Sequence, residues 1–153
     1  MMKAVFTLFA LFLSVHSADI DIESKSFYAN EAEGFSRFSG DVEVTQGEQW
    51  IRSEELFVYF DKNQKPTKLE AKGSAEAYVI LEDGRKLDGS AVNIILYPNN
   101  KVLELIGGAV VKERGSSNQV SGEKIVIDRS KGETRVVGSG DKPARFTIEV
   151  EDD

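Results

Sequence analysis

A glycine recurs along this chain at an almost constant spacing, and the spacing limits the folds that the chain can form. The intervals are 33, 34 and 33 residues, between Gly40, Gly73, Gly107 and Gly140. Repeats of this length are also typical of helical units such as tetratricopeptide and ankyrin repeats. The spacing alone therefore does not distinguish helical repeats from strand repeats, and the hydrophobic pattern between the glycines is needed.

A second frame recurs between the glycines. It reads apolar, any, Ser or Gly, any, any, apolar, any, apolar, and it begins at Ile22, Ile51, Leu87 and Val120. A small residue inside an apolar run indicates a bend in an extended strand. Each unit is thus predicted to be two strands with their turns, and one unit alone cannot bury its apolar face. Stacked units with bends at matching levels would form two facing sheets.

The apolar residues alternate with polar ones, which favours strands over helices. Val42 and Val44 alternate with acidic neighbours, and Leu103 and Leu105 flank Glu104. A period of two with β-branched residues is typical of half-buried strands. Gly, Asn, Asp and Pro clusters, such as DKNQKP from residue 61, separate the runs as turns. The prediction is an all-β jelly-roll or V-shaped sandwich.

Residues 1–17 are predicted to be a cleavable signal peptide and not part of the fold. Lys3 precedes an apolar run from Ala4 to Val15, and small residues follow. We expect cleavage after Ser17, with cleavage after Ala18 as the alternative. The run is short for a membrane span, and an uncleaved anchor is the other interpretation. Residues 18–153 are then one domain with a short acidic C-terminal tail.

Charge and composition exclude several kinds of chemistry. The full chain has a net charge of −7, and without residues 1–17 it has 18 basic against 26 acidic side chains, a charge of −8. This balance argues against nucleic acid as a partner. The chain has no Cys, and its one His, His16, lies in the predicted signal peptide. A Ser-His-Asp or Cys-His mechanism and the usual zinc site are therefore excluded. We expect no enzyme activity, no cofactor and no metal.

Several segments together resemble a known family. They include FSGDVEVTQG from residue 38, IRSEELFVYF from residue 51 and VSGEKIVIDRSKGETRVVGSG from residue 120. These segments resemble the OstA-like family of lipopolysaccharide-transport proteins, above all its LptA members, and the resemblance covers residues 19 to about 148. It implies a V-shaped β-jelly-roll of about 14–16 antiparallel strands in repeated units, with an open apolar groove. The short loop from Asp61 to Lys68 and the acidic tail depart from better-known members.

The resemblance also implies a function. The chain would be a periplasmic bridge that binds lipopolysaccharide by its lipid A acyl chains and passes it from the inner to the outer membrane. Its implied partners are further copies joined head to tail, an inner-membrane LptC-like protein and an outer-membrane LptD-like protein. The strands near Ile20–Phe27 and Arg145–Val150 are the candidate joining edges. A structural or adhesive β-repeat protein with a closed core and no lipid ligand is the alternative.

Alternation along the strands selects the residues expected to line the groove. The set is Ile20, Ile22, Phe38, Val42, Val44, Leu56, Val58, Phe60, Val92, Ile94, Leu96, Leu103, Leu105, Ile125 and Ile127. Each of them could equally be sealed core. The face of Tyr78 stays open, because a bulge could reverse the alternation around it. Trp50 is more typical of a packed surface anchor than of a ligand contact.

Overall fold

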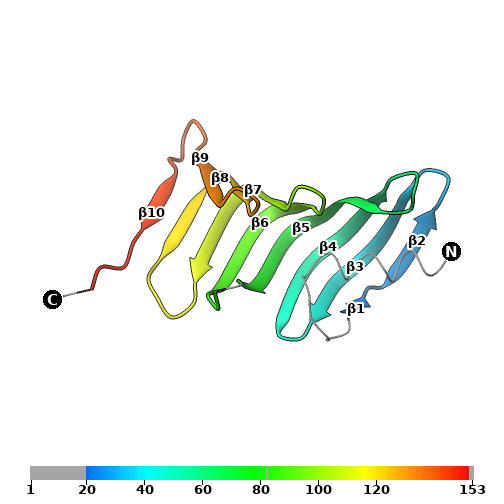
Figure 1. Cartoon of the computed structure of the whole chain (residues 1–153), viewed down its shortest axis with the longest axis horizontal. Coiled ribbons are helices and arrows are strands. Elements are labelled where there is room, and N and C mark those ends of the chain that lie inside the picture. The colour runs from blue at the N-terminus through cyan, green and yellow to red at the C-terminus, as the bar shows by residue number, and fades with distance from the viewer. Residues whose placement is uncertain (1–19, 82, 152–153) are drawn as a thin grey trace.

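The chain forms a single antiparallel sheet (Figure 1). The computed structural model describes residues 20–81 and 83–151, and within them it has ten strands and no helix. In order they are β1 (Ile20–Glu23), β2 (Ser26–Asn30), β3 (Phe35–Gln46), β4 (Gln49–Phe60), β5 (Pro66–Ile80), β6 (Lys86–Tyr97), β7 (Val102–Glu113), β8 (Gln119–Asp128), β9 (Glu133–Val137) and β10 (Arg145–Thr147). The predicted signal peptide and its cleavage site lie outside the described residues.

The strands follow one another as a meander that does not close. Each of β3 to β8 pairs with the next strand along the chain, while β1 and β2 both pair with β3, and β9 and β10 both pair with β8. The first and last strands do not pair with each other. The predicted all-β class is therefore confirmed, and the sheet is not a sealed barrel.

A β-bulge bends each of β3, β5 and β7 near its middle. The register with the neighbouring strands shifts at Gly40, at Gly73 and at Gly107. These glycines have φ values of 86°, 86° and 92°, and the residue after each also has a positive φ. Only glycine adopts such backbone angles at little cost, so the repeat marks the bends. Gly140 is the exception, because it lies between β9 and β10.

Each bulge glycine lies against a side chain that precedes it in the chain, which is Lys25 between β1 and β2, Glu54 in β4 or Val92 in β6. A Cβ on Gly40 would lie 2.8 Å from Cβ of Lys25, and one on Gly107 would lie 2.8 Å from Cβ of Val92. A Cβ on Gly73 would lie 2.5 Å from a carboxylate oxygen of Glu54 and 3.0 Å from its Cβ. A side chain at these positions therefore has no room, independent of the backbone angle.

The second recurring frame, with Ser or Gly at its third position, is aligned correctly in three of its four copies and misplaced in one. Ser53 pairs with Val42 beyond the first bulge, and Gly122 pairs with Ala109 beyond the third. At the second bulge the corresponding residue is Ala91, which pairs with Ala75. The third copy therefore begins two residues later than the predicted Leu87. An alanine in place of Ser or Gly hid the correct alignment.

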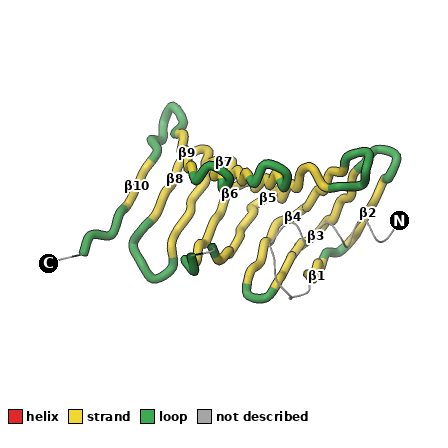
Figure 2. Tube along the Cα trace, viewed as in Figure 1, coloured by secondary structure: helices red, strands yellow, loops and turns green. Residues whose placement is uncertain are grey.

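The bends divide the sheet into two sets of arms that face each other. The upper arms are β2, residues 35–39, 55–60, 66–72, 93–97, 102–106 and 124–128, and β9; the lower arms are β1, residues 42–46, 49–53, 75–80, 86–91, 109–113 and 119–122, and β10. The lower arms run side by side in Figure 2, and the sheet turns over at their upper ends. Six bent strands and four short strands thus give sixteen arms, within the expected range.

Inward-facing residues change their spacing at each bend. On bulged strands they are four residues apart, as in Phe38 and Val42 or Leu105 and Ala109. On the partner strands they are three apart, as in Ala91 and Ile94. A spacing of four keeps the alternation in phase, whereas a spacing of three reverses it. Strict alternation therefore fails once in each partner strand, β4, β6 and β8, and holds along the bulged strands.

The structure also assigns Tyr78 to a face. Ala75 and Ala77 belong to the inner cluster, whereas Tyr78 is buried but lies outside that cluster. Tyr78 pairs in register with Trp50 and Asp88 on the outer face of the lower arms. No parity reversal occurs between residues 75 and 78, since the bulge precedes them.

We predict that Gly107→Ala lowers the free energy of unfolding by about 3 kcal/mol, because it combines a strained φ with overlap against Val92. Gly140→Ala is the matched control, since a Cβ there meets nothing within 4 Å. It should change stability by less than about 0.5 kcal/mol. Urea unfolding of both variants measures the difference, and equal losses would contradict the role of the bulge.

Candidate functional site

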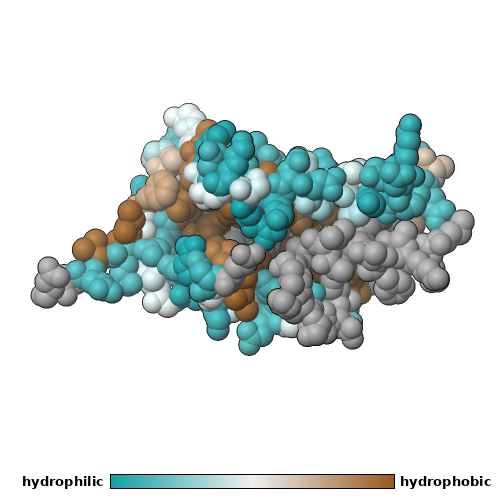
Figure 3. Space-filling model, in the orientation of Figure 1, coloured by the Kyte–Doolittle hydropathy of each residue, from teal (hydrophilic) through white to brown (hydrophobic). Residues whose placement is uncertain are grey.

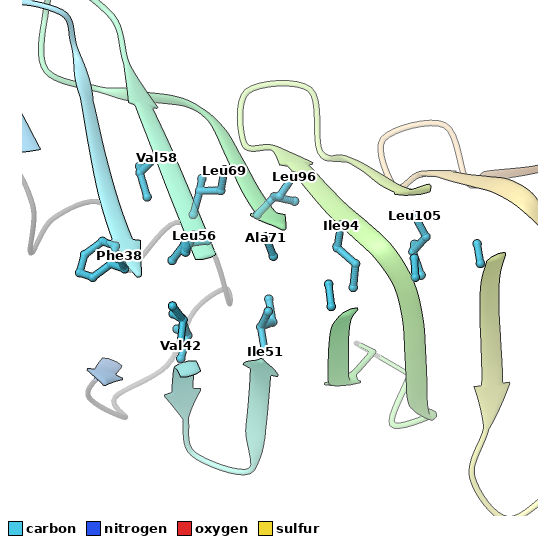
Figure 4. Close-up of a cluster of buried hydrophobic side chains, with 14 of the residues drawn as sticks. Phe38, Val42, Ile51, Leu56, Val58, Leu69, Ala71, Ile94, Leu96 and Leu105 are labelled. Carbon is cyan, nitrogen blue, oxygen red and sulfur yellow. The ribbon is translucent and has the colours of Figure 1, made fainter. Parts of the chain in front are cut away.

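The two sets of arms enclose an apolar trough. Its buried lining consists of Phe38, Val42, Val44, Ile51, Leu56, Val58, Leu69, Ala71, Ala75, Ala91, Ile94, Leu96, Leu105, Ala109 and Ile125. In Figure 4 side chains from the upper arms, such as Leu56 and Leu69, point down toward Val42 and Ile51 of the lower arms. The trough is thus lined from both sides by hydrocarbon.

Thirteen of the fifteen predicted groove residues come together in this lining. Nine are buried members of the cluster: Phe38, Val42, Val44, Leu56, Val58, Ile94, Leu96, Leu105 and Ile125. Four more are partly buried and pack against it: Ile22, Phe60, Leu103 and Ile127. The structure shows their position, and their contact with a lipid stays a prediction.

The other two predicted residues do not join the lining. Val92 is 55% exposed and lies at the bend, where it packs on Gly107. The parity shift gives the inward position to Ala91 instead. Ile20 lies in β1 opposite Gln46, and its side chain is outside the described part of the structure.

Alternation alone missed a group of lining residues, half of them alanines. The buried ones are Ile51, Leu69, Ala71, Ala75, Ala91 and Ala109, and the partly buried ones are Ala77, Val111, Val120 and Val136. Alanine has little hydrophobic contrast, so it is hard to recognise by pattern. The spacing of three on the partner strands would have found Ala91 from Ile94 and, with the alternation continued beyond it, Ile51 from Leu56 and Val120 from Ile125.

Burial along the trough is uneven. The fully buried large side chains are concentrated in β3 to β5, where Val42, Leu56 and Leu69 are at most 2% exposed. Toward the C-terminal end, inward residues such as Leu103 and Val136 are only partly buried. Figure 3 shows apolar surface recessed between polar side chains. Part of the lining is therefore reachable from outside in this half of the molecule, although Leu105, Ala109 and Ile125 there are at most 2% exposed.

The lining carries no buried charge. Its buried polar members are Ser36, Gln46 and Ser53, and the Ser53 hydroxyl donates a 2.8 Å hydrogen bond to the carbonyl of Glu55. In residues 20–81 and 83–151 no group of His, Cys, Asp or Glu side chains is placed to hold a metal ion. None of the described residues forms a helix that could cross a lipid bilayer. The trough is thus suited to an apolar ligand.

Charged and aromatic side chains instead stack on the outer face of the lower arms. The Arg114 guanidinium lies 3.8 Å from the ring centroid of Tyr78, which is 6.4 Å from the ring of Trp50, and the Arg52 guanidinium lies 4.0 Å from the Trp50 ring. Arg114 donates hydrogen bonds of 2.7 and 2.8 Å to the two Asp88 oxygens. These bonds lower the pKa of the Asp88 carboxyl. Trp50 is thus packed, as its sequence position indicated.

The two edges of the sheet expose apolar side chains. Phe27 in β2 is 51% exposed and packs on Phe38 with ring centroids 4.8 Å apart. At the other edge Phe146, Ile148 and Val150 are 61%, 71% and 80% exposed. Within the described residues, β1 and β2 have a neighbour only in β3, and β9 and β10 only in β8. Both edges therefore offer unpaired backbone groups beside hydrocarbon.

This architecture has a counterpart among solved structures. It resembles the crystal structure of LptH, the LptA homologous periplasmic component of the conserved lipopolysaccharide transport device from Pseudomonas aeruginosa, with a TM-score of 0.73 and 22% sequence identity. The match covers 87% of this chain and 96% of LptH. The fold is thus an open β-jelly-roll of the LptA type.

The family follows from a match at the level of sequence. The family model described as LptA/(LptD N-terminal domain) LPS transport protein matches residues 21–133. The chain therefore belongs to this family of lipopolysaccharide-transport proteins, which confirms the resemblance seen in its sequence. Comparison with curated proteins finds no match.

We predict that the Asp88–Arg114 pair supports the fold at neutral pH and stops doing so in acid. Because the folded state lowers the pKa of Asp88 below its ordinary value of 3.8, the contribution is present above that value. It is lost as the pH falls through the lowered pKa. Asp88→Asn should lower Tm by about 2 °C at neutral pH, and the deficit should shrink toward about pH 3.

Thermal unfolding followed by circular dichroism measures this difference. Asp141→Asn, in an exposed segment, is the matched control and should leave Tm unchanged at both pH values. A deficit in Asp88→Asn that is independent of pH would contradict an electrostatic origin.

Proposed function

We propose that this chain is a periplasmic bridge that binds lipopolysaccharide in its trough and passes it from the inner toward the outer membrane. The observation that carries this proposal is an apolar lining in an unclosed sheet, with partly buried members such as Leu103 and Ile127. Membership of a lipopolysaccharide-transport family supports it. So does the fold shared with LptH, which is described as a periplasmic component of such a device.

The physical basis is the cost of moving acyl chains through water. Exposing hydrocarbon costs about 0.8 kcal/mol per CH₂ group. A trough lined on both sides can cover the acyl chains of lipid A and leave the phosphorylated sugar head in solvent. Transfer then needs only neighbouring troughs of similar affinity and new ligand entering behind. No covalent step, cofactor or enzyme activity is required, and the energy would come from another component.

The export route and domain boundaries belong to the same proposal. Residues 1–17 would act as a cleavable signal peptide, and residues 18–153 would form one periplasmic domain with an acidic tail. A domain without Cys rests on its buried cluster alone, which suits either redox condition.

A bridge also requires that copies join, and the exposed edges support head-to-tail joining. An edge formed by β9 and β10 can pair with the β1 and β2 edge of the next molecule, which satisfies unpaired backbone groups on both. This contact is not closed, so it can be repeated. Repeated joining would place one trough after another, and LptC-like and LptD-like partners would occupy the two ends of the series.

We predict that a photo-crosslinking residue in place of Ile22 forms an adduct with lipopolysaccharide in cells. Ile22 packs against the trough lining, whereas its neighbour Asp21 is exposed on the opposite side of β1. The same probe at Asp21 is therefore the matched control and should give no lipid adduct. Gel analysis with lipopolysaccharide detection reads the result. Absence of the adduct at Ile22, with protein adducts still formed at the edges, would favour a structural β-repeat protein with a closed core.

We predict that the purified protein grows in size with concentration and that Phe146→Asp reduces this growth at least about tenfold in association constant. Phe146 is an exposed apolar residue of the edge strand β10. Lys62→Asp is the matched control, since Lys62 is exposed in the turn between β4 and β5 and away from both edges of the sheet. Sedimentation velocity over a concentration series measures both. A monomer at every concentration would contradict self-association.

A further inference from the structure

A second concavity lies on the outer face of the lower arms, away from the trough. Its volume is about 220 Å³, and its walls are Trp50, Glu76, Asp88, Ser90, Val110 and Lys112. Glu76, Ser90 and Val110 are direct cross-strand neighbours on β5, β6 and β7. The backbone of Gly89 and Ala77 forms the floor of the concavity, because the Ala77 side chain and a Cβ built on Gly89 both face the trough on the other side of the sheet. The pocket is thus separated from the trough lining by the thickness of the sheet.

The aromatic wall of this pocket is held in place before any ligand binds. Arg52 covers Trp50 and also contacts Glu43 at 3.3 Å. Tyr78, 5% exposed, fills the space between Trp50 and Arg114. Such packing fixes the rotamer of the indole, and a fixed wall costs less entropy on binding.

Three polar side chains at the pocket keep their hydrogen-bonding capacity for a ligand, although the Lys112 charge also acts on the neighbouring Asp88. Within residues 20–81 and 83–151, the Glu76 carboxylate, the Ser90 hydroxyl and the Lys112 ammonium make no side-chain hydrogen bond or ion pair. Asp88, by contrast, is bound to Arg114 through both oxygens. The pocket thus presents an acceptor, a donor and a group that can be either.

This set of groups matches the chemistry of a sugar ring. A pyranose has apolar C–H faces, which stack on an aromatic ring, and hydroxyls that both donate and accept hydrogen bonds. The volume is below that of pockets for drug-sized ligands, so it fits one small ring. Asp88 is paired with Arg114, and Glu76 and Lys112 carry opposite charges, so the pocket has no net charge and suits an uncharged ring, while the Glu76 carboxylate can also accept from an amino group.

We propose that this pocket binds one neutral or amino pyranose ring of a saccharide. Binding of this ring does not depend on lipid transfer through the trough, because the pocket and the trough lie on opposite faces of the sheet. A saccharide-bearing partner could be held on the outside while the trough stays free.

Trp50 is the one tryptophan of the chain, so its fluorescence reports on this pocket directly. Titration of the full mature chain with methyl α-glucopyranoside and with glucosamine should give a saturable change for at least one, with a Kd of about 0.1–10 mM. Sorbitol, which has the hydroxyls without the ring, should give none. No saturable change with either sugar up to about 100 mM, or an equal change with sorbitol, would overturn the proposal.

Two variants test the assigned contacts. Glu76→Gln and Lys112→Met should each weaken binding about tenfold, while the controls Glu123→Gln and Lys62→Met, both exposed elsewhere, should bind as the parent does. An unchanged Tm shows that the fold is intact. Parent-like binding by both pocket variants would place the sugar elsewhere and overturn the assignment.

Discussion

The architecture depends on one kind of contact, the close approach of a bulge glycine to a side chain of the strand or turn beside it. Gly40, Gly73 and Gly107 each make it, with φ values that other residues adopt only under strain. The contacts lie side by side across the sheet, so all six long strands bend at one level. Without the bends, the apolar side of the sheet would be a single exposed face. With the bends, the apolar side of the upper arms covers the apolar side of the lower arms.

Burial of the trough lining stabilises the fold, but a ligand needs part of that lining exposed. The two halves of the sheet differ in how far the lining is buried. Val42, Leu56 and Leu69 are close-packed as in an ordinary core, and they stabilise the first half of the sheet. Leu103 and Val136 are only partly covered, so the second half keeps hydrocarbon within reach of a ligand. Charges are confined to the outer faces, where pairs such as Asp88–Arg114 meet solvent. The fold therefore carries two chemically distinct faces on one sheet.

The repeat and the alternation were enough to predict an all-β fold with bent strands and most of the trough lining. The errors have two causes. The change of parity on the partner strands moves Val92 out of the lining and Ala91 into it, and it hides Ile51 and Val120. Leu69 and the alanines of β5 and β7 keep their phase, and they were missed because alanine gives a weak hydrophobic pattern. Gly140 matches the spacing by position but not by structure, because residues 138–144 interrupt the last unit. Which side of the sheet Tyr78 occupies could be decided only once the bulge was located.

The unit length has a consequence for how such proteins change over evolutionary time. One unit of 33 or 34 residues supplies two neighbouring strands and one bulge, and neighbouring strands lie about 4.8 Å apart. Duplication of one whole unit in the gene would lengthen the molecule by about 10 Å without altering its cross-section. Gain or loss of part of a unit would instead displace one bend from the common line. Relatives of different length should accordingly differ by whole units.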